Sequence, residues 1–168
     1  LVEADNATAS PIRLTDDDGV ASKYPDLAIG SDAAAVTWFD ERDGNEEVYL
    51  AVAPFGALRD RFEERARRVT TTAGASIGAY LAWNGNRLGL AWSDATDGEA
   101  EVYFQAFDSA GDRLDIAKRL TNNPTASLIP SIQPSDDGFA LAWNEDVVEE
   151  RGDHREGGRS DIVFVRVP

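Results

Sequence analysis

Three segments of the chain alternate between large apolar positions and small or polar ones, and each ends in tryptophan, one further residue and an acid. They are AAVTWFD at 34–40, LGLAWSD at 88–94 and FALAWNE at 139–145. In the second segment Leu88, Leu90 and Trp92 fall on one face, whereas the residues between them are glycine, alanine and serine. A period of two predicts β-strands. Large residues on one face and small ones on the other suit a sheet that is packed on both faces.

These strands belong to a unit that the chain repeats with a period of 51–55 residues. The phrase WFDERDGNEEVY returns as WSDATDGEAEVY, and an interrupted copy starts at Trp143 and resumes at SDIVF. The triplet R-L-T at 13 returns as R-V-T at 68 and as R-L-T at 119. The remaining markers keep the same order and spacing; they are Ser22, Ser76 and Ser127, and Trp38, Trp92 and Trp143. Such a period is typical of stacked supersecondary units.

Each unit predicts four short strands. The first follows the serine (YPDLAI, AYLAW, IPSIQ), the second is the alternating segment, the third is EVYLAVA, EVYFQAF or DIVFVRV, and the fourth is the R-L-T or R-V-T triplet. Four-stranded repeats are typical of β-propeller blades. We therefore expect an all-β propeller domain with blades at 16–70, 71–121 and 122–168, plus a strand at 11–15. A β-sandwich is the main alternative, but it does not require repeats in register. One helix-like stretch, RDRFEERARR at 59–68, lies in a connection and predicts a loop or a single turn.

The third unit lacks a fourth strand of its own, and the spare R-L-T triplet lies at the other end of the chain, at Arg13. Three blades are fewer than the roughly four to eight of most propellers. Lending a terminal strand to the last blade removes exposed edges, so two chains that exchange these strands would form a six-bladed homodimer. Alternatively, the chain is a fragment and the remaining blades lie on a missing segment. The lack of any methionine also suggests a trimmed or excised product.

The combined pattern S-x-x-P, W-x-D-x-x-D-G-x-x-E-V-Y and R-L-T resembles the repeats of bacterial, often secreted β-propeller proteins with sialidase-like or TolB-like blades. The resemblance covers nearly the whole chain and implies an extracytoplasmic location, either secreted, periplasmic or at the cell surface. It implies blades rather than an activity. The Asp-box S-x-D-x-G-x-x-W does not occur in that form, and neither the arginine triad nor the tyrosine–glutamate pair of sialidases has a counterpart, so their activity is not carried over.

Composition restricts the partners. The chain has 16 basic and 31 acidic residues and a net charge of −15. This balance argues against nucleic-acid binding, which needs a basic patch, and against docking on anionic lipid. No apolar run is long enough to span a membrane, and the absence of cysteine excludes disulfides and thiolate chemistry. The excess of acid favours solubility, or else binding of divalent cations.

The repeated phrase joins the second and third strands through an Asp-Gly turn at Asp43 and again at Asp97. In a propeller the entry to the first strand lies at the same end as this turn, so Ser22 should approach Asp40 and Ser76 should approach Asp94. We expect these carboxylates to accept hydrogen bonds from the serine and from loop N–H groups. The alternative is a calcium site, because Ca²⁺ takes six to eight oxygen ligands. Its candidate ligands are Asp40, Asp43 and Glu47 in the first copy, and Asp94, Asp97 and Glu101 in the second.

The third copy carries an insert, VVEERGDHREGGRS at 147–160, in the hairpin where the other copies have their turn. It contains the single histidine of the chain, His154. A solvated loop is the plain expectation, and a partner-contacting loop is the alternative, because loops on rigid scaffolds often carry binding. The candidate contact residues are Arg42, Asp153, His154 and Arg155. A metal site at Asp153 and His154 has little support from one histidine.

Three functions fit this pattern. The first is a non-enzymatic binding module for a protein or glycan ligand. The second is a glycoside-hydrolase-like propeller, or a piece of one, which would need two suitably spaced carboxylates. The third is a structural spacer in a larger extracellular protein. No H-E-x-x-H motif and no phosphate-binding glycine motif occurs. The binding module is therefore the first expectation, without a cofactor apart from the calcium alternative, and with a second copy or missing blades as partner.

Overall fold

The computed structural model of the chain describes residues 11, 13–57, 66–151 and 154–168, with the side chains of 148–151 and 154–158 outside the description. These residues form three antiparallel sheets. The first contains β1 (Ser22–Ile29), β2 (Ala33–Asp40), β3 (Glu47–Pro54) and β4 (Arg67–Arg68), with the short 3-10 turn η1 (Phe55–Ala57) after β3. The second contains β5 (Ser76–Asn84), β6 (Arg87–Asp94), β7 (Glu101–Phe107) and β8 (Lys118–Arg119). The third contains β9 (Ser127–Ser135), β10 (Gly138–Arg151) and β11 (His154–Val167).

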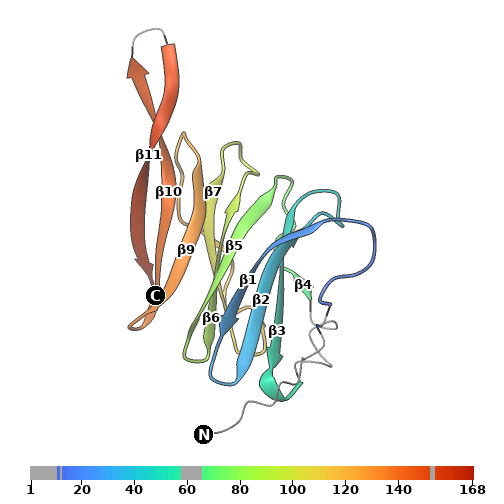
Figure 1. Cartoon of the computed structure of the whole chain (residues 1–168). Coiled ribbons are helices and arrows are strands. Elements are labelled where there is room, and N and C mark those ends of the chain that lie inside the picture. Colours follow the sequence, from blue (N-terminus) through green and yellow to red (C-terminus); the bar gives the residue numbers. More distant parts are fainter. Residues whose placement is uncertain (1–10, 12, 58–65, 152–153) are drawn as a thin grey trace, which may run out of the picture.

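The three sheets stand side by side in chain order, with the second between the other two (Figure 1). Strand β5 packs against β1 and β2 of the first sheet and against β9 of the third. Within each of the first two sheets the strands follow one another in sequence order, and neighbouring strands are antiparallel. The all-β expectation is therefore confirmed. No helix in the described part of the chain is long and apolar enough to cross a membrane.

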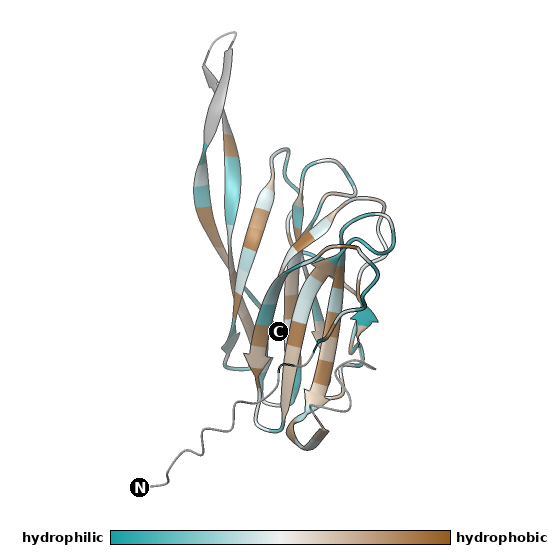
Figure 2. Ribbon diagram, turned by 45° about the vertical axis from the view of Figure 1, so that its right-hand side comes forward, coloured by the Kyte–Doolittle hydropathy of each residue, from teal (hydrophilic) through white to brown (hydrophobic). Residues whose placement is uncertain are grey.

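The core lies between the sheets, on both faces of the second one. Leu88, Leu90 and Trp92 pack toward the first sheet, whereas Ala91 and Phe104 pack toward the third. Apolar and polar bands alternate along the strands accordingly (Figure 2). Small residues are needed on one face because the sheets approach closely. A Cβ atom at position 89, which is glycine, would lie 2.8 Å from the ring of Phe139.

The structure corrects two expectations about segments outside the regular strands. Arg13, Leu14 and Thr15 belong to no strand, because the free edge of the third sheet lies at the far side of the molecule; Leu14 packs instead on the first sheet. The insert at 147–160 is not a loop over its whole length. Register continues to the pair Arg151 and His154, so it lengthens the hairpin of β10 and β11 beyond the other strands (Figure 1). Most of the helix-like stretch at 59–68 lies outside the described residues; its end forms β4.

The first strand of each sheet, β1, β5 or β9, begins with the same irregularity, at the third position of the S-x-x-P motif or its equivalent. Tyr24, Gly78 and Ile129 occupy this position and all have positive φ, at 52°, 61° and 55°. The ladder between the first two strands of each sheet shifts register around them. The repeat therefore conserves a β-bulge. Glycine adopts this backbone freely, whereas a β-branched side chain adopts it only under strain.

We expect Ile129→Gly to stabilise the fold. A left-handed backbone costs a non-glycine residue roughly 1–2 kcal/mol, and glycine removes this strain. The larger loss of backbone entropy when glycine folds offsets about 0.5–1 kcal/mol of the stabilisation. Little burial is lost because Ile129 is 56% exposed. The free energy of unfolding should rise by about 0.5–1 kcal/mol in urea titrations. Leu128→Gly, one residue away, should lower it instead. A destabilised Ile129→Gly protein would show that the bulge is not strained.

Candidate functional site

The carboxylate that ends β2 is the centre of a dense hydrogen-bond network. Asp40 is 1% exposed. It accepts hydrogen bonds from the Ser22 hydroxyl at 2.7 Å, from the Trp38 indole N–H at 3.3 Å and from the backbone N–H of Arg42 at 3.0 Å. The Arg42 guanidinium adds Nε and Nη2 at 3.0 and 2.8 Å. Ser22 thus forms a hydrogen bond with Asp40, as the repeat alignment predicts.

This network determines the charge state of both partners. Burial opposes ionisation of Asp40, but hydrogen bonds from Arg42, Ser22 and Trp38 outweigh it and hold its pKa well below its usual range. The same hydrogen bond raises the pKa of Arg42. The guanidinium also bonds Asp16 at 2.8 Å and lies 4.8 Å from the centre of the Tyr49 ring. Arg42, a predicted ligand contact, is therefore engaged by the protein itself.

The other two carboxylates of the first copy face an arginine from β4. Arg68 bonds Glu47 at 2.8 Å and Asp43 at 3.0 Å. Thr70 donates its hydroxyl to the second oxygen of Glu47, and the Tyr49 hydroxyl donates to Asp43. Burial, and next this hydrogen bond, raise the pKa of Tyr49 above its ordinary value. The R-V-T triplet thus supplies the counter-charge to the acids of the preceding strand.

The second copy keeps this design in part, but the Trp92 indole N–H and Glu101 Oε2 find no hydrogen-bond partner among the described residues. Asp94 accepts from Ser76 at 2.7 Å, from Thr72 at 2.9 Å and from the backbone N–H of Thr96 at 2.9 Å. Thr96 replaces the arginine of the first copy, so Asp94 has hydroxyl partners in place of a guanidinium. The pair of acids after it is again bound by arginine. Arg119 lies 2.9 Å from Asp97 and 2.8 Å from Glu101.

The six candidate calcium ligands are therefore directed at arginine, serine, threonine and tyrosine side chains. Gly44 and Gly98 have φ of 99° and 120°, as the predicted turns require. Within the described ranges, no group of three or more acidic or histidine side chains is placed to hold a metal ion. Calcium binding stays a prediction, and the arrangement favours the structural interpretation of the repeated phrase.

Of the candidate contact residues in the insert, the structure describes only the backbone of two. Asp153 lies outside the described residues. His154 and Arg155 form the start of β11, opposite Arg151 and Glu150, but their side chains are not described. The insert projects at the end of the molecule that carries the Asp-Gly turns (Figure 1).

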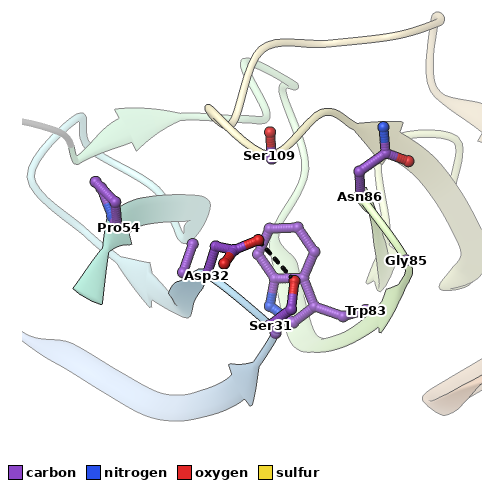
Figure 3. A pocket seen from close by; sticks show the side chains of 9 residues that line it. Ser31, Asp32, Pro54, Trp83, Gly85, Asn86 and Ser109 are labelled. Carbon is purple, nitrogen blue, oxygen red and sulfur yellow. Dashed lines mark hydrogen bonds between the residues drawn. The ribbon is translucent and has the colours of Figure 1, made fainter. Parts of the chain in front are cut away.

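A hollow of about 200 Å³ lies at the opposite end, between the first two sheets. The hairpin of β1 and β2 and the hairpin of β5 and β6 form its walls. Figure 3 shows the Trp83 ring beside Ser31 and Asp32, with Asn86 and Ser109 across the opening. The indole N–H donates to the Ala28 carbonyl at 3.2 Å, which ties the ring to the first sheet. The hydroxyl of Ser31 donates to Asp32 at 2.9 Å.

Sequence reasoning did not find this hollow. Trp83 lies outside the repeated phrase, and its repeat equivalents are Ile29 and Pro134. A tryptophan that breaks a repeat, followed at once by the turn Asn84–Gly85–Asn86, is the feature that would have indicated it. The hollow also depends on two hairpins separated by more than 50 residues, and only the stacking of the sheets brings these together.

A search with models of known protein families finds no match, and a search of curated proteins also finds none. Among solved structures, the chain is similar to the GH43 endo-arabinanase from Bacillus licheniformis, with a TM-score of 0.50 and 14% sequence identity. The similarity covers 87% of this chain and 51% of that one, so the chain spans about half of its length. That enzyme is a five-bladed β-propeller. The likeness indicates a β-propeller-like fold for this chain and nothing finer.

Proposed function

We propose that the chain is a non-enzymatic binding module that holds a neutral, hydroxyl-rich ligand, of the glycan class, in the hollow beside Trp83. One observation carries this proposal: an aromatic ring is surrounded by short polar side chains from three separate connections, Ser31, Asp32, Asn86 and Ser109. Ligand sites typically combine an apolar wall with a few directed polar groups. The indole offers a flat face for the C–H side of a sugar, and the polar groups offer hydrogen bonds to its hydroxyls.

The carboxylates favour binding over catalysis. Those of the repeated phrase are bound by arginine or hydroxyl groups, and the lowered pKa of Asp40 is unsuited to a general acid at neutral pH. Among the described lining residues, Asp32 is the one carboxylate of the hollow. Glycoside hydrolysis usually needs two, at a defined separation. A hollow of about 200 Å³ suits one sugar unit at the end of a chain.

A second candidate is a glycoside-hydrolase-like propeller, or part of one. It is supported by the fold likeness to an endo-arabinanase. Release of reducing ends from arabinan by the purified chain, at a rate abolished in Asp32→Ala, would favour this candidate over the binding module.

The binding proposal is tested with arabinan and other neutral polysaccharides as probes, by affinity electrophoresis and then by calorimetry with oligosaccharides. We expect Trp83→Ala to weaken binding at least about tenfold, as for other aromatic anchors. Asn86→Ala should weaken it by about threefold to tenfold. Because Trp83 also packs between sheets, Asn86→Ala provides the variant with an intact fold.

Tyr24→Ala is the matched control, because Tyr24 is an exposed aromatic residue, at 74%, at the other end of β1. It should bind like the parent chain. Absence of binding to every probe, or binding that survives both Trp83→Ala and Asn86→Ala, would contradict the proposed site.

A further inference from the structure

The outer face of the third sheet carries large apolar side chains without a cover among the described residues. On β11, Ile162 and Phe164 are 73% and 65% exposed. They alternate with valines that pack toward the second sheet. β11 is also an edge strand, since its one neighbour in the sheet is β10. Exposed edges of this length are usually covered or paired in native proteins.

The repeat shows what these positions do elsewhere in the chain. The equivalents of Phe164 are Leu50 on β3 and Phe104 on β7, which are 2% and 0% exposed. Each of them is buried between its own sheet and the next one. Phe104, for example, meets Phe139 of the third sheet at 5.5 Å between ring centres. The third sheet therefore presents a sheet-packing face that none of the other described sheets covers.

The opposite end of the stack presents the complementary surface. On β1, Leu27 and Ile29 are 59% and 61% exposed. The equivalents of Leu27 are Leu81 and Ile132, which are 7% and 3% exposed and pack against the preceding sheet. The first sheet thus exposes side chains whose equivalents in the second and third sheets pack against the sheet before them.

The N-terminal R-L-T triplet already lies where the fourth strand of a preceding sheet would lie. Its equivalents Val69 and Leu120 pair with the preceding third strand, through N–H bonds of 2.7 and 2.8 Å to Val48 and Val102, and pack on the following sheet. Leu14 packs on the first sheet in the same way, but no third strand lies beside it among the described residues.

We propose that a second copy of this chain fills both gaps, so that the third sheet of each protomer packs on the first sheet of its partner. The R-L-T triplet of one protomer then becomes the fourth strand beside β11 of the other. Two such contacts related by a two-fold axis close a ring without free edges.

The proposal assigns a specific ion pair across the interface. Arg68 and Arg119 bind Glu47 and Glu101, the acids that begin the third strand of the same sheet, each at 2.8 Å. The equivalent pair is Arg13 of one protomer and Asp161 of its partner. In the single chain Arg13 bonds the exposed Asp17 at 3.0 Å, an interaction that it can exchange at little cost.

The test is the mass of the full chain by sedimentation and light scattering over a range of concentrations. We expect a particle of about twice 18.2 kDa, which becomes more stable as salt increases because each copy carries a charge of −15. Phe164→Asp should weaken association at least about 100-fold, since it places a charge in an apolar interface. Ile116→Asp, at a residue that is 82% exposed outside this face, should leave association unchanged.

Charge exchange separates the proposed pairing from general apolar contact. Arg13→Glu and Asp161→Arg should each weaken association about tenfold, and the double variant should recover most of the loss. A monomer at all concentrations would overturn the proposal, and so would a dimer that survives Phe164→Asp. Filaments in place of dimers would overturn the closed ring. Circular dichroism of each variant verifies that the fold is intact.

Discussion

Phe104→Ala should remove about 3–5 kcal/mol from the free energy of unfolding, the range for truncation of a buried phenylalanine. Phe104 is fully buried, at 0% exposure, and lies against Phe139 between the second and third sheets. Truncation leaves a cavity that two packed sheets cannot close. Urea unfolding monitored by tryptophan fluorescence measures the loss, with an unchanged dependence on urea as the check for two-state behaviour.

The repeat supplies the control for this experiment. Phe164→Ala makes the same substitution at the equivalent position of the third sheet, where the side chain is 65% exposed. Measured at a concentration where the chain is monomeric, it should change stability by less than about 0.5 kcal/mol. A small effect of Phe104→Ala, below about 1 kcal/mol, would show that the second and third sheets do not pack as described.

Arg68→Ala should be nearly as damaging, although it removes a partly exposed residue. Glu47 is 0% exposed and depends on Arg68, at 2.8 Å, for its counter-charge. Without the guanidinium a buried carboxylate keeps only the Thr70 hydroxyl. Breaking such a pair from one side typically costs about 3–5 kcal/mol, and we expect a loss near the lower end because Arg68 itself is partly solvated.

Two further variants establish the cause. Arg67→Ala removes the neighbouring arginine, whose partner Asp112 is 62% exposed, and should cost less than about 1 kcal/mol. The double variant Arg68→Ala with Glu47→Gln should be more stable than Arg68→Ala alone, because the buried group is then neutral. A double variant less stable than either single one would show that the loss comes from packing rather than from the unpaired charge.

The repeat made several features of the fold and of the carboxylate network predictable. Ser22 and Asp40 are 18 residues apart, yet their equivalence to Ser76 and Asp94 indicated that each pair meets at one end of a hairpin, and each pair is joined at 2.7 Å. Such contacts are local in the repeated unit. They follow from strand alternation and turn chemistry, which short segments of sequence contain.

Contacts that depend on one copy differing from another were harder to predict. Arg42 is an exposed candidate by sequence, but in the fold it closes over Asp40 and Tyr49. Its equivalent Thr96 cannot do so. The insert also looked like a solvated loop because it is dense in charge, whereas antiparallel register continues through it. Backbone pairing with a neighbouring strand overrides a polar composition.

By itself, the sequence of this protein determined an all-β chain of repeated, stacked units, the residues that pack within each unit, and the Asp-Gly turns, because period-two alternation and a constant repeat length encode them directly. The tertiary structure decided which faces meet. It placed Trp83 beside a hairpin more than 50 residues away, and it set Leu14 on the first sheet. It also left Phe164 exposed while Phe104 is buried. Identical positions differ in this way because burial depends on the neighbouring sheet, and only the order of the sheets in space determines where the stack ends.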